Sequence, residues 1–271
     1  MTHAGIPLSQ NELSRHRQVA EGFGTDPGRY DRTRPSYPQA LVDQVLDARA
    51  GLHIVDVGCG TGIASRQFQA VGCTVLGVEP DPRMAEFARR RGLEVETSTF
   101  EAWDPSGRTF DAVISGQTWH WLDAAVGAVK AARALRPGGR LAVFWNAEIP
   151  PPEVRRAFGE VYRRVLPDAL VARQWTTYAL DGYATLCGNA ADGMRKAGTF
   201  GAPNEWRFDW EKSYTRDEWL DQLPTHGDHG QYPVADVEEV QAGVGAAIDR
   251  LGGSFTMGYA TVVVEAVRTS A

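Results

Sequence analysis

The sequence predicts an α/β fold in which a mostly parallel sheet carries helices on both faces. Between residues 38 and 145, short apolar runs rich in Val and Ile alternate with amphipathic segments of helix length. A glycine-rich turn follows the first of these runs, and the alternation ends after Trp145. Such an alternation is typical of βαβ units, which build parallel sheets.

Five strands are expected in this region, each an apolar run bounded by turn residues. They are His53–Val57, Thr74–Glu79, Val95–Ser98, Phe110–Ser115 and Arg140–Trp145. Helices are expected to begin near Gly62, Asp81 and Asp123. Asp81 followed by Pro82 is typical of an N-cap and a first helical position. The segment Arg136–Gly139, with the sequence Arg-Pro-Gly-Gly, indicates a turn before the fifth strand.

The residues after Trp145 predict a helical insertion over the sheet edge. Pro150, Pro151 and Pro152 open a stretch with helical periodicity and few strand-like runs. The core pattern then returns with a helix at Asn189–Ala197, a run at Glu205–Trp210, a helix at Val234–Leu251 and a final strand at Tyr259–Val267.

Composition and charge exclude several classes of function. The 271 residues are 43% hydrophobic, enough for one α/β domain with a modest insertion. A net charge of −6 and a pI near 5.6 disfavour a nucleic-acid partner. Neither a membrane span nor a signal peptide is evident, so we expect no membrane partner and a cytoplasmic protein. Cys59, Cys73 and Cys187 lack metal-site spacing, so we expect free thiols and no metal.

The strongest motif is the turn after the first predicted strand. Gly58, Gly60 and Gly62 allow a sharp bend and a close approach of ligand to backbone, and the following helix offers unpaired N–H groups. Glu79 ends the second predicted strand, where an acid can accept hydrogen bonds from both hydroxyls of a ribose. A glycine-rich turn alone also fits an NAD enzyme. However, a dinucleotide fingerprint needs a third glycine five positions after Gly58, where this chain has Ile63.

With Asp56 ahead of the turn, this pattern resembles motif I of the class I S-adenosylmethionine-dependent methyltransferases. The resemblance extends through roughly positions 30 to 145. It implies a Rossmann-like, seven-stranded, mostly parallel sheet with an antiparallel final strand, helices on both faces, and a helical cap segment inserted after the fifth strand. It also implies S-adenosyl-L-methionine as cofactor and S-adenosyl-L-homocysteine as product.

The resemblance assigns cofactor roles to individual positions. Asp56 would anchor the amino group of the methionine part, Gly58 and Gly60 would line that part, and Gln117 would lie near its end. Glu79, followed by Pro80, would hold the ribose. Thr99 and Phe100, in the segment Ser98–Glu101, would flank the adenine.

A narrower similarity rests on the segments Tyr30–Pro38 and Gln117–Asp123. They resemble a small-molecule subgroup that includes trans-aconitate methyltransferase-like enzymes and tailoring enzymes of secondary metabolism. The likeness places Tyr30, Arg34 and Tyr37 in an N-terminal element that closes over the cofactor, with an arginine available to the cofactor carboxylate. An extended connector is the alternative, and the sequence does not rank Arg32 against Arg34.

The expected organisation has four parts. They are an N-terminal lid segment (1–37), a cofactor-binding core (38–145), a helical substrate cap segment (146–188) and the C-terminal part of the core sheet (189–271).

Methyl transfer is an in-line displacement that needs alignment and exclusion of water. His120 is the first candidate for a catalytic base because its ordinary pKa lies near neutrality, and Tyr30 is the second. His120 is also a candidate for binding the substrate, and simple packing is the alternative role for it. The further candidates for substrate contact are Trp119, Trp145, Tyr178 and Tyr183, of which the two tryptophans are as readily core residues.

The cluster His226, Asp228 and His229 lies on a Gly-rich segment without a convincing further ligand. We expect a solvent-exposed or substrate-rim loop there, not a metal site.

The expected substrate is a small aromatic metabolite, such as an indole, methylated on carbon or nitrogen in natural-product biosynthesis. Carboxylate O-methylation is the runner-up and would use a cationic residue of the cap segment. The candidates are Arg155, Arg156, Arg163, Arg164 and Arg173. An NAD-dependent oxidoreductase and a cofactor-binding protein without catalysis are the competitors from other classes. Monomer and homodimer are both compatible with the sequence.

Overall fold

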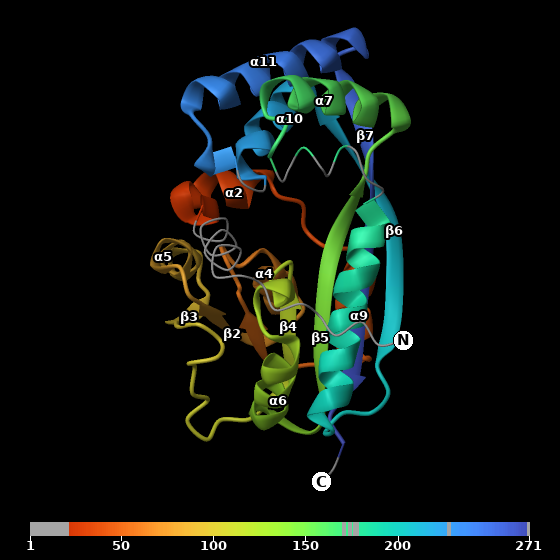
Figure 1. Cartoon of the computed structure of the whole chain (residues 1–271). Coiled ribbons are helices and arrows are strands. Elements are labelled where there is room, and N and C mark those ends of the chain that lie inside the picture. The colour runs from red at the N-terminus through yellow and green to blue at the C-terminus, as the bar shows by residue number, and fades with distance from the viewer. Residues whose placement is uncertain (1–21, 170–171, 173–174, 176–178, 227–228, 270–271) are drawn as a thin grey trace.

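The computed structural model describes residues 22–169, 172, 175, 179–226 and 229–269. The chain forms a seven-stranded sheet in the order β3-β2-β1-β4-β5-β7-β6 (Figure 1). The neighbours among β1 to β5 pair in parallel, whereas β7 runs antiparallel to both β5 and β6. The predicted fold class, a mostly parallel sheet with an antiparallel final strand, is therefore confirmed.

The first two strands have the bounds that the sequence predicts, the third is shifted by one residue toward the N-terminus, and the other four are longer than predicted. The strands are β1 His53–Val57, β2 Thr74–Glu79, β3 Glu94–Thr97, β4 Phe110–Gly116, β5 Leu135–Ile149, β6 Asn204–Thr215 and β7 Ser254–Val267. The turn predicted at Arg136–Gly139 is wrong as a separate element, because these residues lie inside β5. They produce an irregularity there: the ladder with β4 shifts register between Phe110 and Ala112, and Gly138 takes a positive φ of 78°.

Helices connect the strands as expected. They are α2 Pro27–Thr33, α3 Gln39–Leu46, α4 Ile63–Ala70, α5 Pro82–Arg90, α6 Ala124–Ala134, α7 Pro152–Val165, α9 Ala179–Ala197, α10 Arg216–Gln222 and α11 Val234–Arg250. Short 3-10 turns are η1 Phe23–Thr25, η2 Trp119–Trp121, η3 Leu223–Thr225 and η4 His229–Gln231. Asp81 and Asp123 cap α5 and α6 through their side chains, as predicted. The helix expected at Asn189–Ala197 is the second half of α9, which begins at Ala179.

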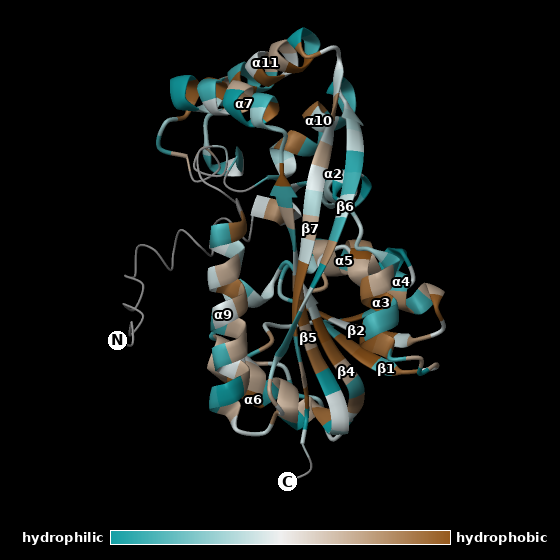
Figure 2. Cartoon of the chain, turned by 90° about the vertical axis from the view of Figure 1, so that its right-hand side faces the viewer, coloured by the Kyte–Doolittle hydropathy of each residue, from teal (hydrophilic) through white to brown (hydrophobic). Residues whose placement is uncertain are grey.

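Two apolar clusters cover the two faces of the sheet. Helices α6 and α9 stand on one face and α3, α4 and α5 on the other (Figure 2). Alternate residues of β5 serve the two faces: Val143 and Trp145 belong to the cluster under α6 and α9, while Ala142 and Phe144 belong to the other.

Strands β5, β6 and β7 continue past the rest of the sheet, and α7, α10 and α11 pack around their far ends (Figure 1). We call these three helices the upper helical layer. Aromatic side chains form its core, among them Phe158 of α7, Trp219 of α10 and Phe255 of β7. Residues 146–188 thus hold the end of β5, α7 and the start of α9, while the rest of this layer comes from residues beyond 188. The division into four parts stays a prediction.

In the described part of the chain, no helix combines the length and the apolar character needed to cross a bilayer.

Candidate functional site

The glycine-rich turn lies between β1 and α4, at the carboxyl end of the parallel strands. Gly58 and Gly60 have φ values of 65° and 55°, a region that L side chains rarely adopt. A Cβ on Gly58 would lie 2.1 Å from Cγ2 of Thr118, which follows β4, so Gly58 is required for packing. A Cβ on Gly60 would meet no heavy atom within 4 Å, so the backbone at Gly60 faces open space. Such a turn leaves room for a ligand against the backbone.

Two buried carboxylates flank this turn. Glu79, at the end of β2, accepts hydrogen bonds from the N–H groups of Gly60 and Asp81, both at 2.9 Å. Asp56, on β1, accepts one from the Ser65 hydroxyl at 2.6 Å. Burial raises the pKa of Glu79 to about 7 and that of Asp56 to about 6. Two acids that are expensive to ionise thus converge on one glycine turn, as expected of a ligand site.

The segment expected to contact adenine runs beside Glu79. The Ser98 N–H donates to the backbone oxygen of Glu79 at 3.2 Å, and both Pro80 and Thr99 are exposed. The Phe100 ring, by contrast, is buried and stacks on Trp103 with 5.8 Å between ring centroids. Phe100 therefore packs in the core beside this edge of the site and does not expose its ring to a ligand.

Gln117 follows β4 and is held in a left-handed conformation with φ of 60°. Its N–H donates to the Phe144 carbonyl at 2.9 Å, and its side-chain amide donates to the Asn146 carbonyl at 3.3 Å. A non-glycine residue in this region is strained. Gln117 thus lies where β4 ends, beside Phe144 and Asn146 of β5, and the next residue, Thr118, contacts Gly58 of the glycine turn.

The N-terminal element reaches into the molecule through Arg34 and Tyr37. Arg34 donates to the Thr225 carbonyl and lies over the Tyr30 ring at 5.4 Å. The Tyr37 ring packs edge-on against Phe144 at 4.7 Å. Burial raises the pKa of the Tyr37 hydroxyl well above its usual value, and the nearby Tyr30 and Asp56 add to this.

Arg32 points elsewhere, since its guanidinium is largely exposed and pairs with Asp221 of α10 at 2.7 Å. The structure therefore ranks Arg34 above Arg32 as the arginine that enters the interior.

The two tryptophans proposed as substrate contacts are core side chains. Trp119 is 2% exposed and Trp145 is 1% exposed, and both belong to the cluster under α6 and α9. Trp145 nevertheless touches the site indirectly, because its indole N–H donates to Nδ1 of the exposed His120 at 3.1 Å. An accepting Nδ1 carries no proton, so a neutral His120 has its proton on Nε2.

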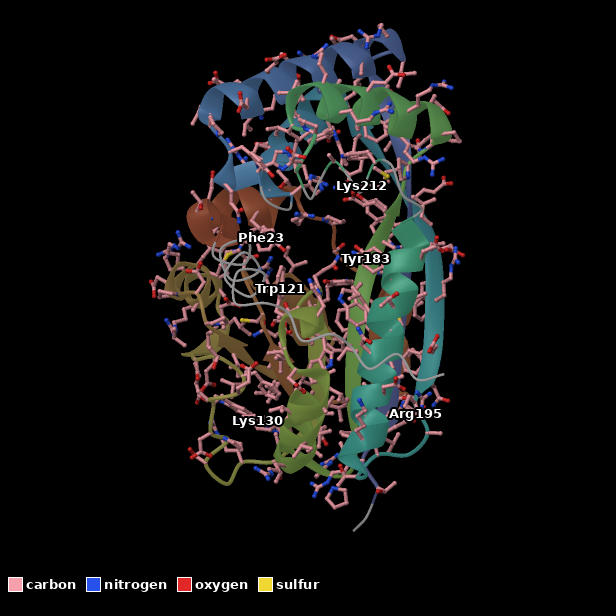
Figure 3. The ribbon with its side chains drawn as sticks, in the orientation of Figure 1. Phe23, Trp121, Lys130, Tyr183, Arg195 and Lys212 are labelled. Carbon is pink, nitrogen blue, oxygen red and sulfur yellow. The ribbon has the colours of Figure 1, made fainter. Side chains whose placement is uncertain are left out.

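Aromatic side chains other than Trp119 and Trp145 surround the site. Trp121 lies against His120 at 4.6 Å, and Phe23 lies against Tyr30 at 5.9 Å. Figure 3 shows Phe23, Trp121 and Tyr183 between the upper helical layer and the lower half of the sheet. The Tyr183 hydroxyl donates to the Asn146 carbonyl at 3.3 Å, and burial followed by the charge of Glu148 raises its pKa.

Tyr178, the remaining candidate for substrate contact, lies outside the described residues. Glu101, a weaker candidate from the sequence for moving a proton, is exposed, and its backbone carbonyl accepts a hydrogen bond from Lys130 at 2.8 Å.

A buried polar cluster under the upper helical layer was missed by the sequence interpretation. Glu148 of β5 contacts His226 through Oε1 and Nε2 at 3.1 Å, and Tyr162 contacts Nε2 of His229 at 2.8 Å. Burial and Arg34 lower the pKa of His226. The expected solvent exposure is therefore wrong for His226 and His229, both of which are buried, and a place at the rim of the substrate site stays a prediction. Asp228 lies outside the described residues.

Among the residues that the structure describes, no group of three His, Cys, Asp or Glu side chains is placed to hold a metal ion.

Most of the described arginines of the cap segment are exposed. Arg163 donates to the Gly159 carbonyl of its own helix, Arg164 pairs with Glu239 at 3.7 Å, and Arg156 is exposed. Arg155 is half-buried, and Arg173 lies outside the described residues.

Comparisons with known proteins agree with this geometry. Residues 55–143 match the family described as a methyltransferase domain. An uncharacterized methyltransferase of Mycobacterium tuberculosis (strain ATCC 25618 / H37Rv) is 33% identical over 178 residues, which cover 60% of this chain and 73% of that protein.

Two solved structures share the fold. One is a candidate type II methyltransferase from Anaeromyxobacter dehalogenans, with a TM-score of 0.62, 19% identity, and coverage of 88% of this chain and 99% of the other. The other is a candidate methyltransferase from an antibiotic biosynthesis pathway of Anabaena variabilis, with a TM-score of 0.57, 15% identity, and coverage of 86% and 98%.

Proposed function

Because the chain belongs to the class I S-adenosylmethionine-dependent methyltransferases, we propose that it methylates a small aromatic metabolite on carbon or nitrogen. The aromatic rim of Phe23, Tyr30, Trp121 and Tyr183 is the observation that carries this proposal. Aromatic side chains bind flat rings by stacking and edge contacts, and they also attract positive charge. The rim follows the ends of the strands that carry the glycine turn, where α/β proteins bind ligands.

The cofactor would lie along the turn and the two acids. Gly60 would provide the open backbone, Glu79 would accept hydrogen bonds from the ribose hydroxyls and Asp56 would face the amino group. Bound S-adenosylmethionine would supply the electrophilic methyl group. Gln117, Tyr30 and Arg34 would close the methionine end, and Pro80 and Thr99 the outer edge, with Phe100 supporting it from the core.

The hydrogen bond from Trp145 gives His120 a defined role. While the indole N–H occupies Nδ1, a neutral His120 carries an N–H donor on Nε2, which suits holding an acceptor in line with the methyl group. To act as a base, His120 would first have to break the hydrogen bond that its Nδ1 accepts from the Trp145 indole N–H. His120 is therefore proposed to position the acceptor, and Tyr30 is the second candidate for moving a proton.

Carboxylate O-methylation is the second candidate, and Arg34 favours it. Its guanidinium enters the interior, and its Nε is buried without a partner within the described residues. A carboxylate is the natural ligand for such a fork of donors.

A tritium-transfer assay with labelled S-adenosylmethionine tests the proposal. The full chain is incubated with indole, tryptamine and trans-aconitate, and label is followed into product. Transfer to an indole ring or amine supports the aromatic proposal, whereas transfer to trans-aconitate alone supports the carboxylate one. Binding of NADH without binding of S-adenosylhomocysteine contradicts both.

We also propose a place in natural-product biosynthesis and a cytoplasmic location. The three cysteines are buried and free, which fits a reducing compartment. The acidic net charge of −6 supports a small-molecule substrate over a nucleic acid. Size-exclusion chromatography with light scattering separates the monomer from the homodimer.

A further inference from the structure

A cavity of about 460 Å³ lies on the side of α4 that faces β6. Its walls include Arg34, Ser36, Arg66, Gln67, Trp210 and Lys212. Helix α4 contributes Ile63, Arg66, Gln67 and Ala70, whose spacing places them on one helix face. The volume falls within the range of small-molecule sites.

The cavity adjoins the glycine turn, because Arg66 donates to the Thr61 carbonyl at 2.7 Å, and Pro35 and Ser36 of the segment Pro35–Tyr37 form part of its wall. Gln67 holds this segment from the cavity side, accepting from the Tyr37 N–H at 2.9 Å and donating to its carbonyl at 2.7 Å. The side-chain amide of Asn146 donates to the Ser36 carbonyl at 3.1 Å from the sheet. The Tyr37 ring packs against Phe144 of β5. One strip of chain thus forms a wall of both sites.

The aromatic wall of the cavity is fixed in advance. Trp210 of β6 stacks on Tyr259 of β7 with ring centroids 4.3 Å apart and planes 11° from parallel. Its indole N–H donates to the Thr261 hydroxyl at 2.8 Å. An aromatic side chain held from two directions needs no reordering before a ligand binds, which favours affinity.

The charges of the cavity are unbalanced toward positive. Asp31 is its single acid, and Arg66 at 2.5 Å and Arg91 at 3.3 Å already neutralise this carboxylate. Lys212 lies over the Tyr214 ring at 4.6 Å, and Arg34 donates to a carbonyl. Within the described residues neither of these two cations forms an ion pair with a carboxylate.

We propose that this cavity is a second ligand site for a small organic anion, with Lys212 binding its carboxylate or phosphate group and Trp210 contacting its apolar part. Burial lowers the pKa of Lys212, because the ammonium group has lost part of its hydration. An oxyanion would restore that lost interaction. Lys212 and Trp210 are not among the residues that the proposed function assigns to the cofactor or to the methyl acceptor.

Isothermal titration of the full chain, saturated with S-adenosylhomocysteine, tests the site. The probes are indole-3-acetate, benzoate and inorganic phosphate, which separate an aromatic carboxylate from a simple phosphate. We expect one probe to bind at one site per chain with a Kd of about 1 mM or tighter. Lys212→Met should weaken it about tenfold or more, and Lys212→Arg should retain it within about threefold.

The control variant is Lys196→Met, which removes the same charge next to Arg195 at the far end of α9 (Figure 3). It should leave the affinity unchanged. The proposal is overturned if none of the probes binds at about 10 mM, if Lys212→Met binds like the parent, or if saturation with S-adenosylhomocysteine abolishes binding that the free protein shows.

Discussion

Glu79 accepts a hydrogen bond from the Gly60 N–H at 2.9 Å, so the acid that ends β2 and the turn that follows β1 are directly connected. Burial keeps the pKa of this carboxyl at about 7 before any ligand is present. Ribose hydroxyls donate hydrogen bonds to the ionised carboxylate, so cofactor binding and ionisation of Glu79 favour each other.

The affinity for S-adenosylhomocysteine should therefore fall as the pH falls from 8 to 6. In the free protein Glu79 is largely ionised at pH 8 and largely protonated at pH 6, which predicts a Kd that rises by about tenfold. Titration calorimetry at fixed ionic strength measures it. Glu79→Gln should bind more weakly and show a much flatter pH profile; an equally steep profile in this variant would place the titration on another group.

Asp56→Asn should separate stability from binding. The Asp56 pKa rises from 3.8 to about 6 on folding, so the charged side chain costs stability as the pH rises through that window, and the cost is complete above it. Asn can still accept the hydrogen bond from Ser65. Without cofactor, we expect the variant to melt a few degrees higher at pH 8, with a smaller difference at pH 4.5, and to lose affinity for S-adenosylhomocysteine. A lower Tm at pH 8 contradicts this account.

The two glycines of the turn should fail in different ways when each is replaced by Ala. Both have positive φ, which costs about 1 kcal/mol for an L side chain. Gly58→Ala also drives its Cβ into Thr118, so its urea midpoint should drop strongly. Gly60→Ala meets only open space, so its midpoint should change little while its affinity for S-adenosylhomocysteine drops about tenfold. Equal losses of stability in the two variants would contradict the difference in packing, and an unchanged affinity in Gly60→Ala would contradict a binding role for the open backbone at Gly60.

His120→Ala should reduce turnover about a hundredfold while leaving the affinity for S-adenosylhomocysteine nearly intact. Trp145→Phe keeps an aromatic ring in the core but removes the N–H that donates to His120. We expect this second variant to shift the pH profile of kcat and, because Phe leaves part of the buried space of Trp145 empty, to lower the Tm by several degrees. Unchanged turnover in His120→Ala would leave the imidazole with a packing role.

Helix α2 contacts two parts of the molecule through opposite charges, which predicts unequal losses. Asp31, whose side chain is 5% exposed, pairs with Arg66 and Arg91 of the core, while Arg29 and Arg32 pair with Asp221, which is 34% exposed. Asp31→Asn should cost about 1–3 kcal/mol of unfolding free energy. Asp221→Asn should cost less than about 1 kcal/mol. Urea denaturation measures both, and the reverse order would contradict this assignment.

The sequence predicted the positions of the residues around the glycine turn better than those of the residues after β4, for physical reasons. His53–Val57 and Thr74–Glu79 are short, buried strands bounded by turns, so their pattern fixes both their ends and the positions of Asp56 and Glu79. Trp119 and His120 lie in a 3-10 turn, where neighbours point to opposite sides: one is buried and the other exposed. No periodicity distinguishes them.

The end of β5 was underestimated because polar residues interrupt its apolar run. Asn146 and Glu148 nevertheless continue the strand, because β7 supplies Thr261 and Tyr259 as their ladder partners. Those partners are more than a hundred residues away in the chain, so local pattern carries no sign of them. A separation of 78 residues likewise hid the contact between Glu148 and His226.

The long ladder of β5 with β7, from Arg140 and Val267 to Ile149 and Gly258, has a consequence for protein engineering. The helices of the upper helical layer are connected to the ends of three adjacent strands, β5, β6 and β7. The layer therefore cannot be exchanged as one contiguous segment of the chain. A chimera that takes this layer from a relative must exchange the stretch after β5 and the stretch between β6 and β7 together, with junctions inside paired strands of matched register. Replacing either stretch alone would leave half of an aromatic core facing water.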